Sequence, residues 1–234
     1  PFTFNHLDKH GTAGLELATS YTARNHIASL PSGVNLISSL AFPMQYSAYI
    51  NQNTRRSTRD LAPKWGQNFL IEYEHLPFDH HLEGHILSIQ SLFFTPGLWL
   101  NHSFSASINS QISGGTAYEY ALNIPTVSGY NRLNNTETLK NTLLLDYRLP
   151  LAYPDWEIGS LAYIKRIRGG LFADFENIGP NKAFSPRTYG FELRADVNLL
   201  RFYLPNFVMG GKMIFTSDQS VKKPIFEFGL TYSY

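Results

Sequence analysis

Pro224-Ile-Phe-Glu-Phe-Gly-Leu-Thr-Tyr-Ser-Tyr234, the last stretch of the chain, alternates between apolar and polar side chains. One set is apolar and consists of Phe226, Phe228, Leu230, Tyr232 and Tyr234. The other set consists of Glu227, Gly229, Thr231 and Ser233. Because successive side chains of a β-strand point to opposite sides, the spacing predicts a strand with one apolar and one polar face. Such a strand is typical of a transmembrane barrel wall, which is apolar toward lipid, polar toward the lumen and aromatic at the interface.

Two earlier segments repeat this alternation. In 190–199 the charged or polar side chains are Glu192, Arg194, Asp196 and Asn198, and the residues between them are apolar. In 142–149 the polar side chains are Thr142, Asp146 and Arg148, with Leu144 as an interruption. Polar side chains in register need water or each other, so we expect the polar faces to line an interior.

About ten strand-like segments with turn residues between them recur along the chain. They are 13–23, 34–50, 67–76, 83–95, 98–110, 142–149, 169–177, 190–199, 206–216 and 225–234. Their lengths suit barrel strands, and Pro43 predicts an edge or a bulge within 34–50. We therefore predict an all-β fold, an antiparallel transmembrane β-barrel, as one domain over residues 1–234.

Composition narrows the function classes. The chain has 234 residues, no cysteine, and 19 basic against 18 acidic side chains. These values favour neither a disulfide framework nor a nucleic-acid partner. No window approaches the roughly 18 consecutive apolar residues of a membrane helix, so a membrane crossing is expected to use strands.

The connections divide between two sides of the predicted barrel. If the C-terminus is periplasmic and neighbouring strands are antiparallel, the long connection 111–137 lies on the outer side. Connections 51–66 and 150–168 then lie on the periplasmic side. Two long periplasmic connections depart from the short turns that are usual in bacterial barrels.

The last third of the chain resembles the last four strands of the surface-antigen superfamily, the barrel of the outer-membrane assembly and translocation factors. The resemblance rests on Arg168-Gly-Gly-Leu-Phe-Ala-Asp-Phe-Glu-Asn-Ile-Gly179, on 189–203, on 207–215 and on the terminal strand. Segments 59–66 and 147–166 resemble a branch in which a similar barrel follows a periplasmic propeller of the Tol type. Together these stretches cover most of the chain from about residue 55 onward.

The superfamily carries an Arg-Gly-Tyr or Arg-Gly-Phe motif where this chain has Ser128-Gly-Tyr130. The resemblance implies that Gly129 and Tyr130 belong to a loop folded into the lumen. In the superfamily the arginine pairs with an acidic group on the strand that here carries Asp174. Since Ser128 replaces the arginine, Asp174 loses its expected partner, and Arg132 is a candidate substitute.

The resemblance also implies a location and partners. The location is the cell outer membrane, and the partners are the lipid bilayer, the barrel-assembly machinery and a periplasmic domain or partner chains. The terminal alternation ending at Tyr234 resembles the signal that this machinery recognises. The superfamily barrel has sixteen strands, so the ten predicted strands are either its last ten or a smaller barrel that closes alone.

Three functional hypotheses remain open. The first is a membrane anchor that also serves protein or lipid insertion or translocation, without a cofactor. The second is a passive channel or small-ligand-binding barrel, with a lumen wall formed by Arg148, Asp174, Glu192, Arg194 and Asp196. The third is a soluble β-sandwich or lipocalin-like binder, in which the apolar strand faces pack against another layer.

Two clusters carry candidate chemistry. His75, His80, His81 and His85 lie among Glu72, Glu74, Asp79 and Glu83, but no His-Glu-x-x-His spacing occurs, so we expect a solvated turn and no metal. A basic run beside Trp65 contains Arg55, Arg56, Arg59 and Lys64. We expect this run at a membrane interface, with a lipid-phosphate or partner dock as the alternative. No Gly-x-Ser-x-Gly elbow is present, and no enzymatic activity is expected.

Overall fold

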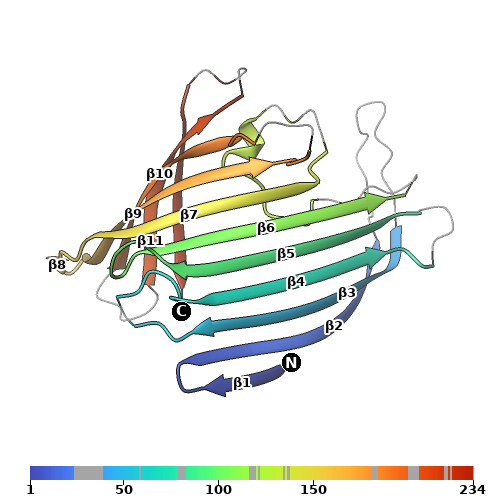
Figure 1. Cartoon of the computed structure of the whole chain (residues 1–234), viewed down its shortest axis with the longest axis horizontal. Coiled ribbons are helices and arrows are strands. Elements are labelled where there is room, and N and C mark those ends of the chain that lie inside the picture. The colour runs from blue at the N-terminus through green and yellow to red at the C-terminus, as the bar shows by residue number, and fades with distance from the viewer. Residues whose placement is uncertain are drawn as a thin grey trace.

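The strands of the computed structural model form one antiparallel sheet of twelve strands (Figure 1). The structure describes residues 1–23, 39–57, 59–78, 83–115, 120, 122–133, 135, 138–180, 184–199, 206–218, 221 and 223–233. The strands are β1 (Phe2–His6), β2 (Lys9–Ala23), β3 (Ser39–Thr54), β4 (Gly66–His75), β5 (His85–Pro96), β6 (Ser103–Gly114), β7 (Asn141–Ala152), β8 (Trp156–Ile158), β9 (Ala162–Glu176), β10 (Thr188–Leu199), β11 (Asn206–Thr216) and β12 (Ile225–Ser233). Each strand pairs with the next along the chain, except that β7 pairs with β9 and β8 joins β9 from the side.

The predicted all-β, antiparallel fold is confirmed, but the strand count of about ten was too low. The two strands without a predicted segment are β1, with five residues, and β8, with three. β8 is too short to display an alternating pattern, whereas β1 alternates Phe2 and Phe4 with Thr3 and Asn5 and was missed. The expected connection 150–168 is also partly wrong, because β9 already begins at Ala162.

The sheet is strongly curved but open. In Figure 1, β2 to β6 run across the view, whereas β10 to β12 run steeply at its left side. Within the described residues, β1 pairs only with β2 and β12 pairs only with β11. The sheet is therefore not closed into a barrel.

The irregularity predicted from Pro43 is confirmed. The register between β2 and β3 shifts between Thr19 and Tyr21, opposite Phe42 and Pro43. Phe42 has a φ of 49°, in the left-handed region that non-glycine residues rarely adopt. A bulge at this point lets a proline lie inside the strand without breaking the ladder on either side of it.

The sheet has two chemically distinct faces. One rung places Tyr147, Leu171, Phe191, Met213 and Phe226 side by side across β7 to β12. The neighbouring rung places Arg148, Gly170, Glu192, Lys212 and Glu227 side by side. The apolar face continues on the other half of the sheet through Leu17, Tyr46, Tyr73 and Leu87.

Burial is inverted relative to a water-soluble sheet. On the apolar face Leu17, Phe191 and Phe228 are exposed, with Phe228 at 79%. On the polar face Asn109, Asp174 and Glu192 are buried. Within the described residues no helix is long and apolar enough to cross a membrane.

Candidate functional site

The connection between β6 and β7 folds back over the polar face of the sheet. We call its residues 122–133 the strap. Val127 and Leu133 of the strap are buried in a cluster with Phe172 of β9, Ile214 of β11 and Ile225 of β12. These apolar groups stand on the otherwise polar face, so the strap removes them from water and is held there by their burial.

Asp174 of β9 fixes the strap in position. The backbone N–H of Ser128 donates a hydrogen bond of 2.8 Å to Oδ2 of Asp174, which is 4% exposed. The hydroxyl of Thr188 donates to the same oxygen at 3.3 Å. The structure thus brings together Asp174 and the loop of Gly129 and Tyr130, and the group that the loop offers to Asp174 is a main-chain N–H.

Gly129 allows this close approach. Its φ is 77°, in the left-handed region, and it precedes a single 3-10 turn, Tyr130–Arg132. A Cβ at this position would lie 3.4 Å from Cδ1 of Ile225. That distance is an ordinary van der Waals contact, so it is the backbone conformation that favours glycine at this position.

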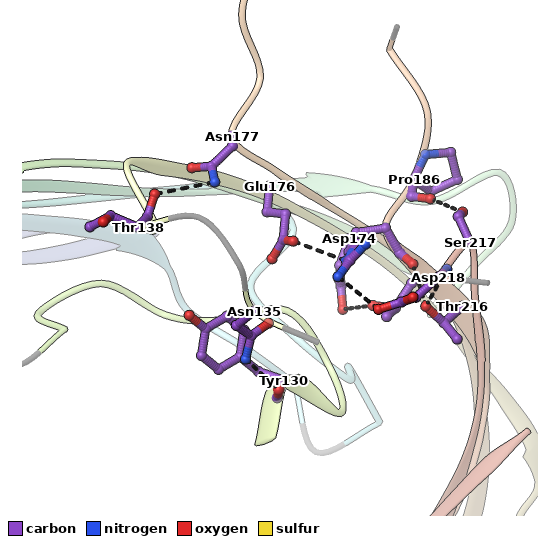
Figure 2. Close-up of polar contacts among 12 residues, drawn as sticks. Tyr130, Asn135, Thr138, Asp174, Glu176, Asn177, Pro186, Thr216, Ser217 and Asp218 are labelled. Carbon is purple, nitrogen blue, oxygen red and sulfur yellow. Dashed lines mark hydrogen bonds and ion pairs between the residues drawn. The ribbon is translucent and has the colours of Figure 1, made fainter. Parts of the chain in front are cut away.

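Arg132 does not substitute for the missing arginine beside Asp174. Its Nη1 donates a hydrogen bond of 3.2 Å to the carbonyl oxygen of Phe226, on β12. Tyr130 accepts a hydrogen bond of 2.9 Å from Asn135 at its carbonyl oxygen (Figure 2). Partial burial, and next the negative charge of Glu176, raise the pKa of the Tyr130 phenol.

The other end of the strap is fixed to strands on the opposite half of the sheet. The side-chain amide of Asn123 donates to Glu72 of β4 at 3.2 Å and to Ser88 of β5 at 3.1 Å. Its backbone N–H donates to Gln111 of β6 at 3.1 Å, and its carbonyl accepts from Gln90 at 2.8 Å. The strap consequently crosses the polar face from β4 to β12.

Glu192 is the centre of a charged cluster beside the strap. Its carboxylate lies 2.8 Å from Arg194, 3.7 Å from Arg148 and 3.9 Å from Lys212. Arg148 is on β7 and reaches Glu192 across β9, where Gly170 has no side chain. A Cβ on Gly170 would lie only 2.7 Å from Cγ of Glu192.

Asp196 forms a second centre on the same face. It pairs with Arg166 through the Nε and Nη2 groups, and with Arg168 at 3.3 Å. Four of the predicted lumen-wall residues therefore pair with one another or with further cations, namely Arg148, Glu192, Arg194 and Asp196, whereas Asp174 binds the strap. This is the arrangement in which opposite charges on neighbouring strands satisfy each other.

Sequence reasoning missed the cations Arg166, Arg168 and Lys212 and the strap residue Asn123. Arg166 lies beside a register shift between β9 and β10, where the alternation that would reveal it is broken. Lys212 is the one charged residue of β11 and has no charged neighbour at alternate positions to mark a polar face. The cations that pair with Asp196 could therefore not be predicted from the alternation of side chains.

A second set of polar contacts joins the strand ends beyond the strap (Figure 2). Arg187 pairs with Glu176 at 3.0 Å and with Asp218 at 3.0 Å. Its backbone N–H donates to the carbonyl of Asp174 at 2.8 Å. The ends of β9, β10 and β11 are therefore held together at the same end of the sheet as the strap.

The histidine cluster does not converge on one point. His75 and His85 are directly opposite one another on the apolar face, whereas Glu72 and Glu74 project from the polar face. Asp79, His80 and His81 lie outside the described residues. Among the residues that are described, no group of three or more acidic, histidine or cysteine side chains could hold a metal ion.

The terminal strand carries its predicted apolar side chains on the exposed face. Phe226, Phe228 and Leu230 are 64%, 79% and 56% exposed. Tyr234 and the side chain of Tyr232 lie outside the described part of the chain. Whether this strand is read as an assembly signal stays a prediction.

No family model, curated protein or solved structure matches this chain.

Proposed function

We propose that this sheet spans an outer membrane as the wall of a β-barrel and serves there as a membrane anchor. The observation that carries the proposal is the inverted burial. Large apolar side chains such as Phe191, Leu193 and Phe228 are exposed on one face, while Glu192 and Asp196 are buried on the other. In water the exposed face would be costly, whereas in a bilayer it meets hydrocarbon.

Strand length and composition support the same proposal. β4 to β7 and β10 to β12 contain 9 to 12 residues each. A tilted strand of about 9–11 residues crosses the hydrocarbon core of a bilayer. Every backbone group inside lipid must find a partner in the protein, and a closed barrel provides this condition. The proposal therefore includes closure of the edges at β1 and β12.

The interior supports an anchor better than an open channel. The strap crosses the polar face and is bonded at Asn123, Ser128 and Arg132. The charges that would select ions are already paired with one another at Glu192 and Asp196. We expect reconstituted protein to conduct little, and neutralising Arg194 to affect stability rather than conductance.

The resemblance to the surface-antigen barrels adds a role in protein or lipid insertion or translocation. What favours this role is that closure of the barrel depends on β1 and β12, whose outer edges have no strand partner within the described residues. A strand edge with unpaired backbone groups is a template for pairing with another strand. The mechanism would be physical: a weak seam beside β12 lowers the barrier to insertion, with no covalent step.

The proposal is tested by comparing the refolded chain in water, in detergent and in phospholipid vesicles. We expect a β-rich circular dichroism spectrum only with detergent or lipid, a form that migrates differently before and after boiling, and resistance to extraction from vesicles at alkaline pH. A monodisperse β-rich protein in plain buffer would support the soluble binder and contradict the membrane proposal.

A further inference from the structure

All three tryptophans of the chain lie at one end of the sheet. Trp65 precedes β4, Trp99 is in the turn between β5 and β6, and Trp156 is in β8. They are 60%, 69% and 60% exposed. We call this the tryptophan end; it holds the connections β1–β2, β3–β4, β5–β6 and β7–β9 and lies at the left in Figure 1.

The turn between β5 and β6 is built to present apolar groups outward. Leu98, Trp99 and Leu100 are 78%, 69% and 86% exposed. The hydroxyl of Tyr147 accepts a hydrogen bond from the backbone N–H of Leu98 at 3.2 Å and lies 2.8 Å from Nδ1 of His102. The turn is therefore held in a defined shape while its three apolar side chains stay uncovered.

The connection between β3 and β4 presents cations beside these apolar groups. Arg55, Arg56, Arg59 and Lys64 are exposed. The only acid in this connection is Asp60, and its carboxylate turns back onto the connection's own backbone. Its Oδ2 accepts a hydrogen bond of 2.8 Å from the backbone N–H of Ser57. Leu61 and Ala62 are buried and anchor the connection, so the cationic side faces outward.

We propose that the tryptophan end lies in the headgroup region of a bilayer leaflet that contains anionic phospholipids. This inference rests on the proposed membrane function. It adds how deeply the tryptophan end lies in the bilayer and the charge of the lipid headgroups that it contacts. The indoles lie at headgroup level, where amphipathic rings are favoured, and Leu98 and Leu100 reach toward the acyl chains. Arg55, Arg56, Arg59 and Lys64 face lipid phosphates.

The distribution of the groups favours lipid over a protein partner. The exposed apolar residues Leu7, Trp65, Trp99, Trp156 and Leu161 come from four separate connections around this end. A protein interface gathers its anchors in one compact, central patch. Apolar and aromatic groups spread along the rim, with the cations of the β3–β4 connection among them, are instead what a flat anionic surface meets.

The chain itself supplies the probe, because tryptophan fluorescence reports on this end alone. The protein is reconstituted in vesicles of phosphatidylcholine with and without phosphatidylglycerol, with quenchers placed at the headgroup or deep in the acyl chains. We expect quenching to be stronger from the headgroup position. In micelles, R55Q/R56Q should weaken the apparent affinity for added phosphatidylglycerol, measured by tryptophan emission, by roughly fivefold per cation removed.

The matched control is K140Q/K223Q, which removes two exposed cations at the opposite end and should leave that affinity unchanged. A bimane label on Phe191→Cys reports in parallel on the apolar face. If the label is quenched by lipid but the tryptophans are not, or if R55Q/R56Q has no effect, this inference is wrong and the membrane proposal stands. If neither probe is quenched, the membrane proposal itself fails.

Discussion

On the polar face, a single glycine allows two charged side chains from unpaired strands to approach one another. Arg148 and Glu192 are on strands that do not pair, since β9 lies between them. Gly170 of β9 leaves the space through which they approach to 3.7 Å. A buried carboxylate without its cations would be strongly unfavourable. Gly170 therefore contributes to stability because the absence of a side chain leaves room for the Arg148–Glu192 pair.

Replacing Gly170 by alanine should therefore destabilise the fold. The new Cβ would displace the Glu192 side chain, and we expect a loss of about 1–3 kcal/mol, the usual range for overpacking. The measurement is the free energy of unfolding by urea in micelles. Gly229→Ala is the control, because a Cβ there meets nothing within 4 Å and should change stability by less than about 0.5 kcal/mol.

Asp174 gives a second test at this scale. In Asp174→Ala the N–H of the half-buried Ser128 loses its acceptor, which should cost about 1–3 kcal/mol. Asp174→Asn retains a carbonyl oxygen and should recover most of that loss. Unfolding curves of the two variants distinguish them. Equal loss in both would indicate that the negative charge, rather than the hydrogen bond, holds the strap.

At the scale of elements, alternation was the informative signal. The segments with clean alternation, 190–199 and 225–234, match β10 and β12 closely. The path of the strap could not be predicted from the residues alone, because its contacts from Asn123 to Ile225 join residues far apart in the chain. Sequence reasoning left Asp174 without its expected partner, and it predicted neither the bond from the Ser128 N–H to Asp174 nor the bond from Arg132 to β12.

The strap can be released without altering any strand. Val127→Asp places a charge in the cluster of Phe172, Ile214 and Ile225, and burying it there is unfavourable. We expect the strap to detach and limited proteolysis to cut it at least tenfold faster. Leu122→Asp is the matched control, since Leu122 belongs to the same connection but is 42% exposed. Equal cleavage rates for both variants would show that Val127 does not hold the strap.

For the whole molecule, the direction of the edge strands limits how the sheet can close. β1 and β12 both run toward the tryptophan end, because ten alternating pairings separate them. Direct pairing of these two edges would be parallel. Antiparallel closure requires one of two arrangements. Either an odd number of additional strands bridges the gap between β12 and β1, or β12 pairs with β2 in place of β1.

Amide exchange can detect such closure. β1 pairs only with Lys9–Ala13 of β2, so from Gly14 to Tyr21 the edge facing away from β3 is free within the described residues. In the open sheet the amides on that edge should exchange quickly, while those of β6 and β7 stay protected. Protection of both edges of β2 in vesicles would show that another strand covers it there.

The central claim is that the apolar face meets lipid, and neighbouring residues on β12 test it most directly. Leu230 points to the apolar face and Thr231 to the polar face. Because the chain contains no cysteine, Leu230→Cys and Thr231→Cys can each carry a single environment-sensitive fluorophore. In vesicles the account predicts blue-shifted emission quenched by spin-labelled acyl chains at position 230, and neither effect at position 231. Water-like, unquenched emission at both positions would contradict it.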